Sequence, residues 1–429
     1  MANTNIMRSF QLKTIVLTCA LAAPLAWSQT GSATAPAAIT PAASAPAGPT
    51  IRTELRTALL DAQTLINEKK YPQAKEKIQL ANAFADKTPY ETYIVARMAL
   101  SIAITEDDAP GANKLLEQVL ELNTSGAWLK PEETLPLMHA VGITHYRTKD
   151  YTQAAAWMER NIKAGGTDQS VKSVRIQAYM LGGNLQRGSE LINEEISANE
   201  QAKKVPPQAY IEMLAQARNN LKDQAGYSRA LELLVQHYPS KANWRLLINR
   251  LWNRSDLATR LQLDVFRLAF YNDTPEEATD YSEYVDFAQK GGYSGEALLA
   301  YDRGVAAGML GTTDAHKKLR AKLVQEGEQD RKTLATDTAA ALKKPDGFAL
   351  FNIGLNLVGM QQYDKGLELM EKGIAKGLAK RPEDARLRLA VAYAQAGQKD
   401  KALQSLATVT GPEGLTELAR YWALAVRKS

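Results

Sequence analysis

Three pairs of adjacent carboxylates are the residues of this chain whose type and spacing could do acid–base chemistry: Asp107–Asp108, Glu194–Glu195 and Glu276–Glu277. Two carboxyl groups that face each other across a sugar can hydrolyse a glycosidic bond. These pairs, however, fall in turns or at expected helix starts, where acidic side chains suit the helix dipole. Thr274 and Pro275 precede the third pair as an N-cap and a first-turn proline would. We therefore predict no enzyme, and we keep an all-α carbohydrate-active enzyme, a glycosidase or lyase, as the alternative.

We find no metal-binding or cofactor-binding motif in the sequence. His139 and His145 are six residues apart, which does not place two histidines on one helix face as helical zinc pairs require. The glycine-rich stretch 291–295 looks like a phosphate cradle, but it precedes an expected helix and is better interpreted as a hairpin turn. Cys19 is the only cysteine. We predict no cofactor and no metal site.

The stretch 244–254 is the strongest candidate for binding. In a helix, Trp244, Leu247, Ile248 and Leu251 would form a core stripe, and polar side chains would line the neighbouring faces. Arginine and asparagine side chains there could hold a peptide backbone or a carboxylate. The nominated protein-binding residues are Arg245, Asn249, Arg250, Asn253 and Arg254. A solvated basic face beside a two-tryptophan core is the alternative, and the usual frequency of charged helix faces favours it.

The elements that would position these residues are helices almost throughout. From residue 51 onward, apolar residues recur at spacings of three and four, and alternating strand patterns are missing. Small residues recur twelve apart, on either side of short polar turns that often carry a tyrosine: Ala62 and Ala74, Gly142 and Ala154, Gly354 and Gly366, Ala390 and Ala402. We interpret each pair as the point where two helices of a hairpin cross too closely for a larger side chain.

This rhythm resembles the tetratricopeptide repeat family, whose repeat is about 34 residues long. A small residue, an aromatic and an Ala or Gly match the family motif in three repeats, and a fourth break has the same form. The matching residues are Gly142, Tyr151 and Ala154; Gly354, Tyr363 and Gly366; Ala390, Tyr393 and Ala402; and Tyr227 and Ala230. The resemblance implies an all-α superhelix, or solenoid, of about nine to eleven hairpins.

The repeats are clearest near 55–88, 136–166, 348–380 and 383–411, and their phase is not readable across 240–345. A subset of the family grips peptide carboxylates with Lys, Asn and Arg on the first helix of each hairpin. The corresponding places of one repeat hold Phe348, Phe351, Leu355 and Val358, which predicts an apolar groove or burial against the next repeat. Residues 415–426 would form the apolar face of a last, capping helix.

The N-terminal segment predicts export. Arg8 and Lys13 precede an apolar run over 15–25, which is shorter than the roughly 20 residues that span a bilayer, and Ala26-Trp27-Ser28 suits a signal peptidase. We predict a signal peptide over 1–28, an Ala- and Pro-rich disordered tether over 29–50 and the solenoid over 51–429. A buried helix of a cytosolic protein is the alternative for the first segment. The processed chain would be periplasmic or secreted, without a transmembrane segment.

Charge and fold together predict the kind of partner. Without Arg8 and Lys13 the chain has 50 basic and 47 acidic residues, so it lacks the basic footprint of nucleic-acid binders. A solenoid offers extended surfaces for macromolecules. We expect an exported, non-catalytic scaffold that binds other proteins or peptides, with cell-envelope assembly, secretion or polysaccharide export as its setting and an envelope complex as a possible partner.

Overall fold

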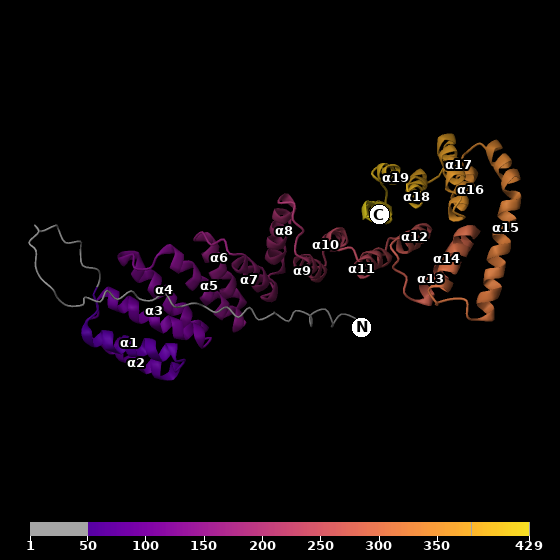
Figure 1. Ribbon diagram of the computed structural model, residues 1–429. Coiled ribbons are helices and arrows are strands. Elements are labelled where there is room, and N and C mark those ends of the chain that lie inside the picture. Colours follow the sequence, from indigo (N-terminus) through magenta and orange to yellow (C-terminus); the bar gives the residue numbers. More distant parts are fainter. Residues whose placement is uncertain (1–49, 379, 429) are drawn as a thin grey trace, which may run out of the picture. The chain divides into compact units, whose positions relative to one another are not determined.

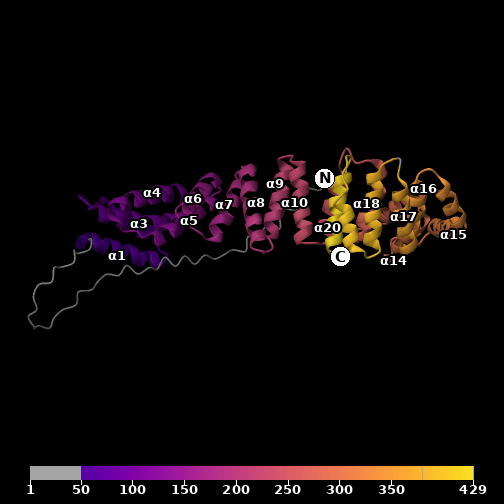
Figure 2. The ribbon, with the colours of Figure 1, turned by 90° about the horizontal axis from the view of Figure 1, so that it is seen from above.

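The computed structural model describes residues 50–378 and 380–428; the predicted signal peptide and nearly all of the predicted tether lie outside this range. From Thr53 onward the described residues belong to one compact unit. They contain twenty α-helices, one short 3-10 helix and no strand. None of these helices combines the length and the apolar character that a membrane crossing requires. The fold is all-α, as the sequence predicts, and is a superhelix of helical hairpins (Figures 1 and 2).

The helices follow one another as antiparallel pairs through most of the chain. Their bounds are α1 (Thr53–Asn67), α2 (Tyr71–Ala83), α3 (Pro89–Thr105), α4 (Ala109–Gly126), α5 (Pro131–Arg147), α6 (Tyr151–Lys163), α7 (Gln169–Leu181), α8 (Leu185–Gln201), α9 (Gln208–Asn220), α10 (Gln224–His237), α11 (Lys241–Trp252), η2 (Thr259–Leu261), α12 (Gln262–Tyr271), α13 (Ala278–Lys290), α14 (Ser294–Ala306), α15 (Asp314–Lys343), α16 (Phe348–Gly359), α17 (Tyr363–Lys376), α18 (Pro382–Gln395), α19 (Lys399–Leu406) and α20 (Leu415–Lys428).

Eight hairpin turns of the described chain contain one residue with positive φ. These turn residues are Lys69, Asp107, Lys149, Gly183, Lys222, Gly292, Gln361 and Gly397. A left-handed residue ends the first helix by letting the next N–H reach back to a free carbonyl, as Asp150 N–H does to His145 O at 2.9 Å. The small residues twelve apart in the sequence lie seven residues before and five residues after such a turn residue.

The position five residues after the turn is the more restrictive of the two. It holds Ala or Gly in seven of the eight turns: Ala74, Ala112, Ala154, Gly188, Ala297, Gly366 and Ala402. The alanines among them are fully buried. The earlier position also accepts Leu100, Ile176 and Val285, so the second helix of each pair sets the closeness of the crossing.

The pair α16–α17 has the tightest backbone approach that the sequence anticipates. A Cβ atom on Gly354 would lie 2.5 Å from Gly366 O, and one on Gly366 would lie 2.8 Å from Gly354 O. About two helical turns away, Gly347 N–H donates to Gly377 O at 2.8 Å, and a Cβ on Gly347 would meet Gly373 O. Backbone atoms of the two helices therefore touch where no side chain intervenes.

Two local predictions are wrong. Tyr227 does not lie in a turn: it is the fourth residue of α10, because the turn comes earlier, at Lys222. The helix expected at Thr274 begins instead at Ala278. There the Thr274 hydroxyl donates to Ala269 O at 3.1 Å, closing the preceding turn, while the Asp280 carboxylate accepts the N–H groups of residues 276 and 277.

The region 240–345, where the repeat phase is not readable from the sequence, contains a helix that is not part of a hairpin. Helix α15 is 30 residues long, and only Leu323, Gly327 and Ala341 along it are buried. It contacts both α14 and α16. A single long, mostly polar helix has no hairpin turn along its length, which explains why the repeat rhythm disappears there.

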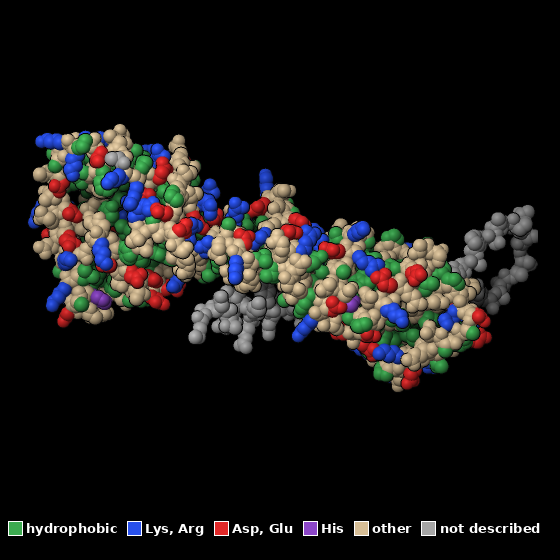
Figure 3. All heavy atoms as spheres, turned by 180° about the vertical axis from the view of Figure 1, so that it is seen from behind, with side chains coloured by type: hydrophobic (Ala, Val, Ile, Leu, Met, Phe, Trp, Pro, Cys, Tyr) green, Lys and Arg blue, Asp and Glu red, His purple; other side chains and the backbone are tan. Residues whose placement is uncertain are grey.

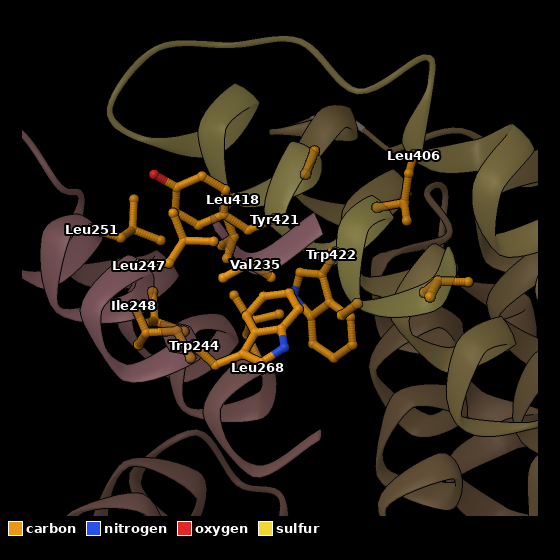
Figure 4. Packing of buried hydrophobic residues seen from close by; sticks show 14 of the residues in the cluster. Val235, Trp244, Leu247, Ile248, Leu251, Leu268, Leu406, Leu418, Tyr421 and Trp422 are labelled. Atoms are coloured by element: carbon orange, nitrogen blue, oxygen red, sulfur yellow. The ribbon is translucent and has the colours of Figure 1, made fainter. Parts of the chain in front are cut away.

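The last helix is more than the cap that the sequence predicts. Helix α20 packs against α10, α12 and α18 as well as its neighbour α19. Trp422 of α20 and Trp244 of α11 are both fully buried in the cluster drawn in Figure 4, where Leu268 of α12 joins them. Glu417 and Tyr421 are buried on the side of α20 away from a simple apolar stripe. The chain therefore returns, and its end contacts helices nearly 200 residues earlier.

Candidate functional site

Helix α11 positions the nominated binding residues. The Ser240 side chain accepts the N–H of Asn243 at 3.1 Å and so caps the first turn. The predicted core stripe is buried as expected: Trp244, Leu247, Ile248 and Leu251 are at most 3% exposed. Burial of this stripe fixes the rotation of the helix, so its polar residues lie along two separate edges.

The structure divides the nominated residues into two groups. Arg245 and Asn249 line a small depression of about 60 Å³ beside Pro275, where Arg245 forms an ion pair with Glu276. Arg250, Asn253 and Arg254 line a much larger cleft of about 750 Å³. The five residues therefore do not form one surface.

We call the larger space the arginine cleft. It lies between α10, the end of α11 and the segment that leads into α20. Its lining includes four arginines and three carboxylates: Arg229, Arg250, Arg254, Arg420, Asp256, Glu413 and Glu417. In the face drawn in Figure 3, basic and acidic side chains are interspersed across the surface. The charge that the cleft offers to a ligand therefore depends on which of its own side chains are paired with each other.

Every carboxylate of the arginine cleft is already paired. Arg254 binds Asp256 through two hydrogen bonds of 2.9 and 2.7 Å and reaches Glu417 at 2.5 Å. Glu413 pairs with Arg260, which lies outside the cleft. Arg254 thus ties the end of α11 to α20, so its first role is structural.

Two arginines remain without such a partner. Within the described residues, Arg229 and Arg250 form no salt bridge or side-chain hydrogen bond, and the buried Nε of Arg250 has no acceptor. Arg420, by contrast, donates to Glu232 at 2.7 Å. The exposed amide of Asn253 lies on the same cleft. A guanidinium has five N–H donors, so this cleft can accept an anion.

Two of the three carboxylates of the cleft have a lowered pKa, which does not suit acid catalysis. Burial raises the pKa of Glu417, but hydrogen bonds from Tyr421 and Arg254 outweigh it, and the pKa lies below its usual value. A hydrogen bond from Arg254 likewise lowers the pKa of Asp256. A general acid needs a raised pKa. Over the described range no cluster of three potential metal ligands occurs.

The acidic pairs nominated for sugar chemistry are dispersed. Asp107 pairs with Arg147, Glu195 with Lys172 and Glu276 with Arg245, and none of these carboxylates lines the arginine cleft. Of the two alternatives predicted for Phe348, Phe351, Leu355 and Val358, an apolar groove or burial against the next repeat, the structure shows burial for three, and only Phe348 is open, at 54% exposed. Phe351, Leu355 and Val358 belong to the core shared with α18.

Sequence reasoning did not find Arg229 and Arg420. Neither α10 nor α20 carries another binding signal in its sequence, and each arginine reaches the cleft because α20 packs against α10. The signal that the sequence offered was the position of Arg229, two residues after Tyr227, where a turn was predicted. A one-dimensional repeat predicts contacts between neighbours only.

Comparison with known proteins finds no family and only distant similarity to solved structures. No family model matches the chain, and no curated protein matches it. Among solved structures, the "TPR2AB-domain:pHSP90-complex of yeast Sti1" is 14% identical, with a TM-score of 0.23, covering 68% of this chain and 98% of that one. The P58(IPK) TPR domain is 10% identical, with a TM-score of 0.22, covering 88% and 99% respectively. These values assign neither a family nor a function, so the fold rests on the helices themselves.

Proposed function

We propose that this protein is a non-catalytic scaffold that binds other proteins, and that its arginine cleft takes an acidic segment of the partner. The observation that carries the proposal is the pair of unpaired guanidiniums, Arg229 and Arg250, on one open cleft of about 750 Å³. Two like charges on one cleft repel each other, and a carboxylate between them removes that repulsion while gaining charge-assisted hydrogen bonds. The amide of Asn253 can hold the peptide backbone beside them.

A fluorescein-labelled peptide of nine residues, rich in Asp and Glu, tests this proposal by fluorescence anisotropy. The double variant Arg229→Glu/Arg250→Glu should weaken binding at least tenfold, since each lost charge-assisted bond contributes about 1.5–3 kcal/mol. The matched control is Lys318→Glu/Lys332→Glu, which changes net charge by the same amount at two exposed positions of α15. Equal affinity of the two double variants for the acidic peptide would show that the cleft does not bind it. Equal binding of a peptide in which Lys replaces Asp and Glu would show that the cleft has no preference for negative charge.

We further propose that the chain is exported and acts in the cell envelope, in assembly, secretion or polysaccharide export. The support is the sequence alone: a basic start, a short apolar run and small residues at 26 and 28. Mass spectrometry of the protein isolated from cell fractions checks it. We expect a periplasmic or secreted form that begins at Gln29, and a cytosolic form that keeps residues 1–28 would contradict it.

A further inference from the structure

A second cavity, which we call the inner pocket, lies among six helices of the C-terminal half. Side chains of α12, α13, α14, α16, α17 and α18 line it, and its volume is about 250 Å³. Phe270, Tyr284, Leu355 and Val391 are among the apolar and aromatic residues of its wall. A cavity just below the roughly 300–1,000 Å³ of drug-sized sites, whose wall combines apolar and aromatic side chains with convergent charged groups, has the form of a small-molecule pocket.

A buried ionic network forms the polar part of this wall. Arg267 donates to both Glu296 oxygens, at 2.7 and 2.6 Å, and also binds Asp264. Tyr284 donates to Glu296 at 2.6 Å. Arg388 of α18 reaches Asp264 of α12 at 3.0 Å. Two carboxylates and two guanidiniums thus balance, and the network fixes the wall between distant parts of the chain.

Two arginines keep hydrogen-bond donors beyond this network. The bonds of Arg388 to Asp264 and to Arg260 O use Nε and Nη2, so its Nη1 group remains for a ligand. Arg303 lies over the Phe270 ring at 5.0 Å, and its Nη1 donates to Phe270 O at 3.0 Å. Within the described part of the chain, its salt-bridge partner is Asp273, at 3.5 Å. The side chain of Arg303 is 41% exposed, so its remaining N–H groups are reachable.

From this arrangement we propose that the inner pocket binds a small organic anion, a carboxylate on an aromatic or branched apolar body. Arg303 and the free Nη1 group of Arg388 take the carboxylate, and the aromatic and aliphatic wall takes the body. The single carboxylate of the lining, Glu296, is neutralised by Arg267 and does not repel an anion. This site is separate from the arginine cleft and does not depend on it.

The probe for this proposal is 1-naphthoate, titrated into the full chain by isothermal titration calorimetry. We expect one site per chain, and at least tenfold weaker binding of 1-naphthamide, which has the same body without the charge. Arg303→Gln should weaken 1-naphthoate at least tenfold, because Arg303 stands outside the balanced network and its loss leaves the fold intact. The control is Arg320→Gln, an exposed arginine of α15 that pairs with Asp302 and does not line the pocket.

The outcomes separate this inference from the proposed function. Arg229→Glu/Arg250→Glu should leave 1-naphthoate binding unchanged, whatever it does to the acidic peptide. The inference is overturned if the native chain does not bind 1-naphthoate, if the amide binds as tightly, or if Arg303→Gln and Arg320→Gln bind alike. Thermal unfolding of each variant, followed by circular dichroism, establishes that the compared proteins are folded.

Discussion

The hairpin crossing between α16 and α17 makes a prediction in which two glycine substitutions have opposite signs. In Gly354→Ala the new Cβ would lie 2.5 Å from Gly366 O and 2.8 Å from Met370 N, both backbone atoms that belong to a packed helix. In Gly327→Ala on α15 the new Cβ would meet only Ser294 Oγ, at 3.9 Å. Both glycines are helical, so the two substitutions gain the same intrinsic helix propensity, about 1 kcal/mol.

The magnitudes follow from these distances. Overpacking costs about 1–3 kcal/mol, and the upper end applies at residue 354 because a backbone carbonyl cannot rotate away as a side chain can. After the gain in helix propensity, Gly354→Ala should lower the free energy of unfolding by about 2 kcal/mol. Gly327→Ala should raise it by up to about 1 kcal/mol.

Urea unfolding followed by circular dichroism measures both changes, and hydrogen exchange localises them. Because neighbouring pairs of a solenoid can open separately, Gly354→Ala should also speed amide exchange in α16 and α17 more than in α1 and α2. Two substitutions with the same sign, or a Gly354→Ala variant as stable as the native chain, would refute the crossing geometry.

Two more predictions concern the contacts of α20 and the buried ionic network of the inner pocket. Trp422→Ala should cost about 3–5 kcal/mol and should speed amide exchange in α10 and α12 as well as in α18; a change confined to α18–α20 would contradict the packing described. Folding lowers the pKa of Glu417 and Asp264. The stability that each ionised carboxylate contributes is therefore fully present at pH values above its unfolded-state pKa, and it is lost as the pH falls through its folded-state pKa. The free energy of unfolding should therefore drop between about pH 5 and pH 3, with a shallower drop in Glu417→Gln, and a drop of equal depth in that variant would exclude Glu417 as a contributor.

The helical class and the crossings could be predicted because both depend on local pattern. Apolar spacing of three and four predicts helices, and two small residues twelve apart on either side of a short polar segment mark a turn with a left-handed residue between them. The turn predicted at Tyr227 was wrong because a tyrosine three residues before Ala230 has the same spacing, although the actual turn lies earlier, at Lys222. The stretch 291–295, interpreted as a hairpin turn, has the same geometry, because Ala297 lies five residues after Gly292 although Val285 occupies the earlier position.

The return of α20 could not be predicted from such a pattern. Arg260 binds Asp384 at 2.7 Å across 124 residues, and Arg254 binds Glu417 across 163. No local spacing specifies which arginine meets which carboxylate at that separation. The sequence therefore identified α11 as a candidate binding helix, while the assignment of Arg254 to structure and of Arg229 to the cleft required the contacts of α20.

Photocrosslinking in intact cells tests most directly whether the arginine cleft binds partner proteins. p-Benzoylphenylalanine replaces Asn253 in the cleft or, as a control, Leu80, which is 58% exposed on α2, and mass spectrometry identifies the crosslinked peptides. We predict that position 253 captures Asp- and Glu-rich peptides that position 80 does not, and that Arg229→Glu/Arg250→Glu abolishes the capture. Capture of the same peptides from both positions, or capture that survives the double variant, would contradict the role of the cleft.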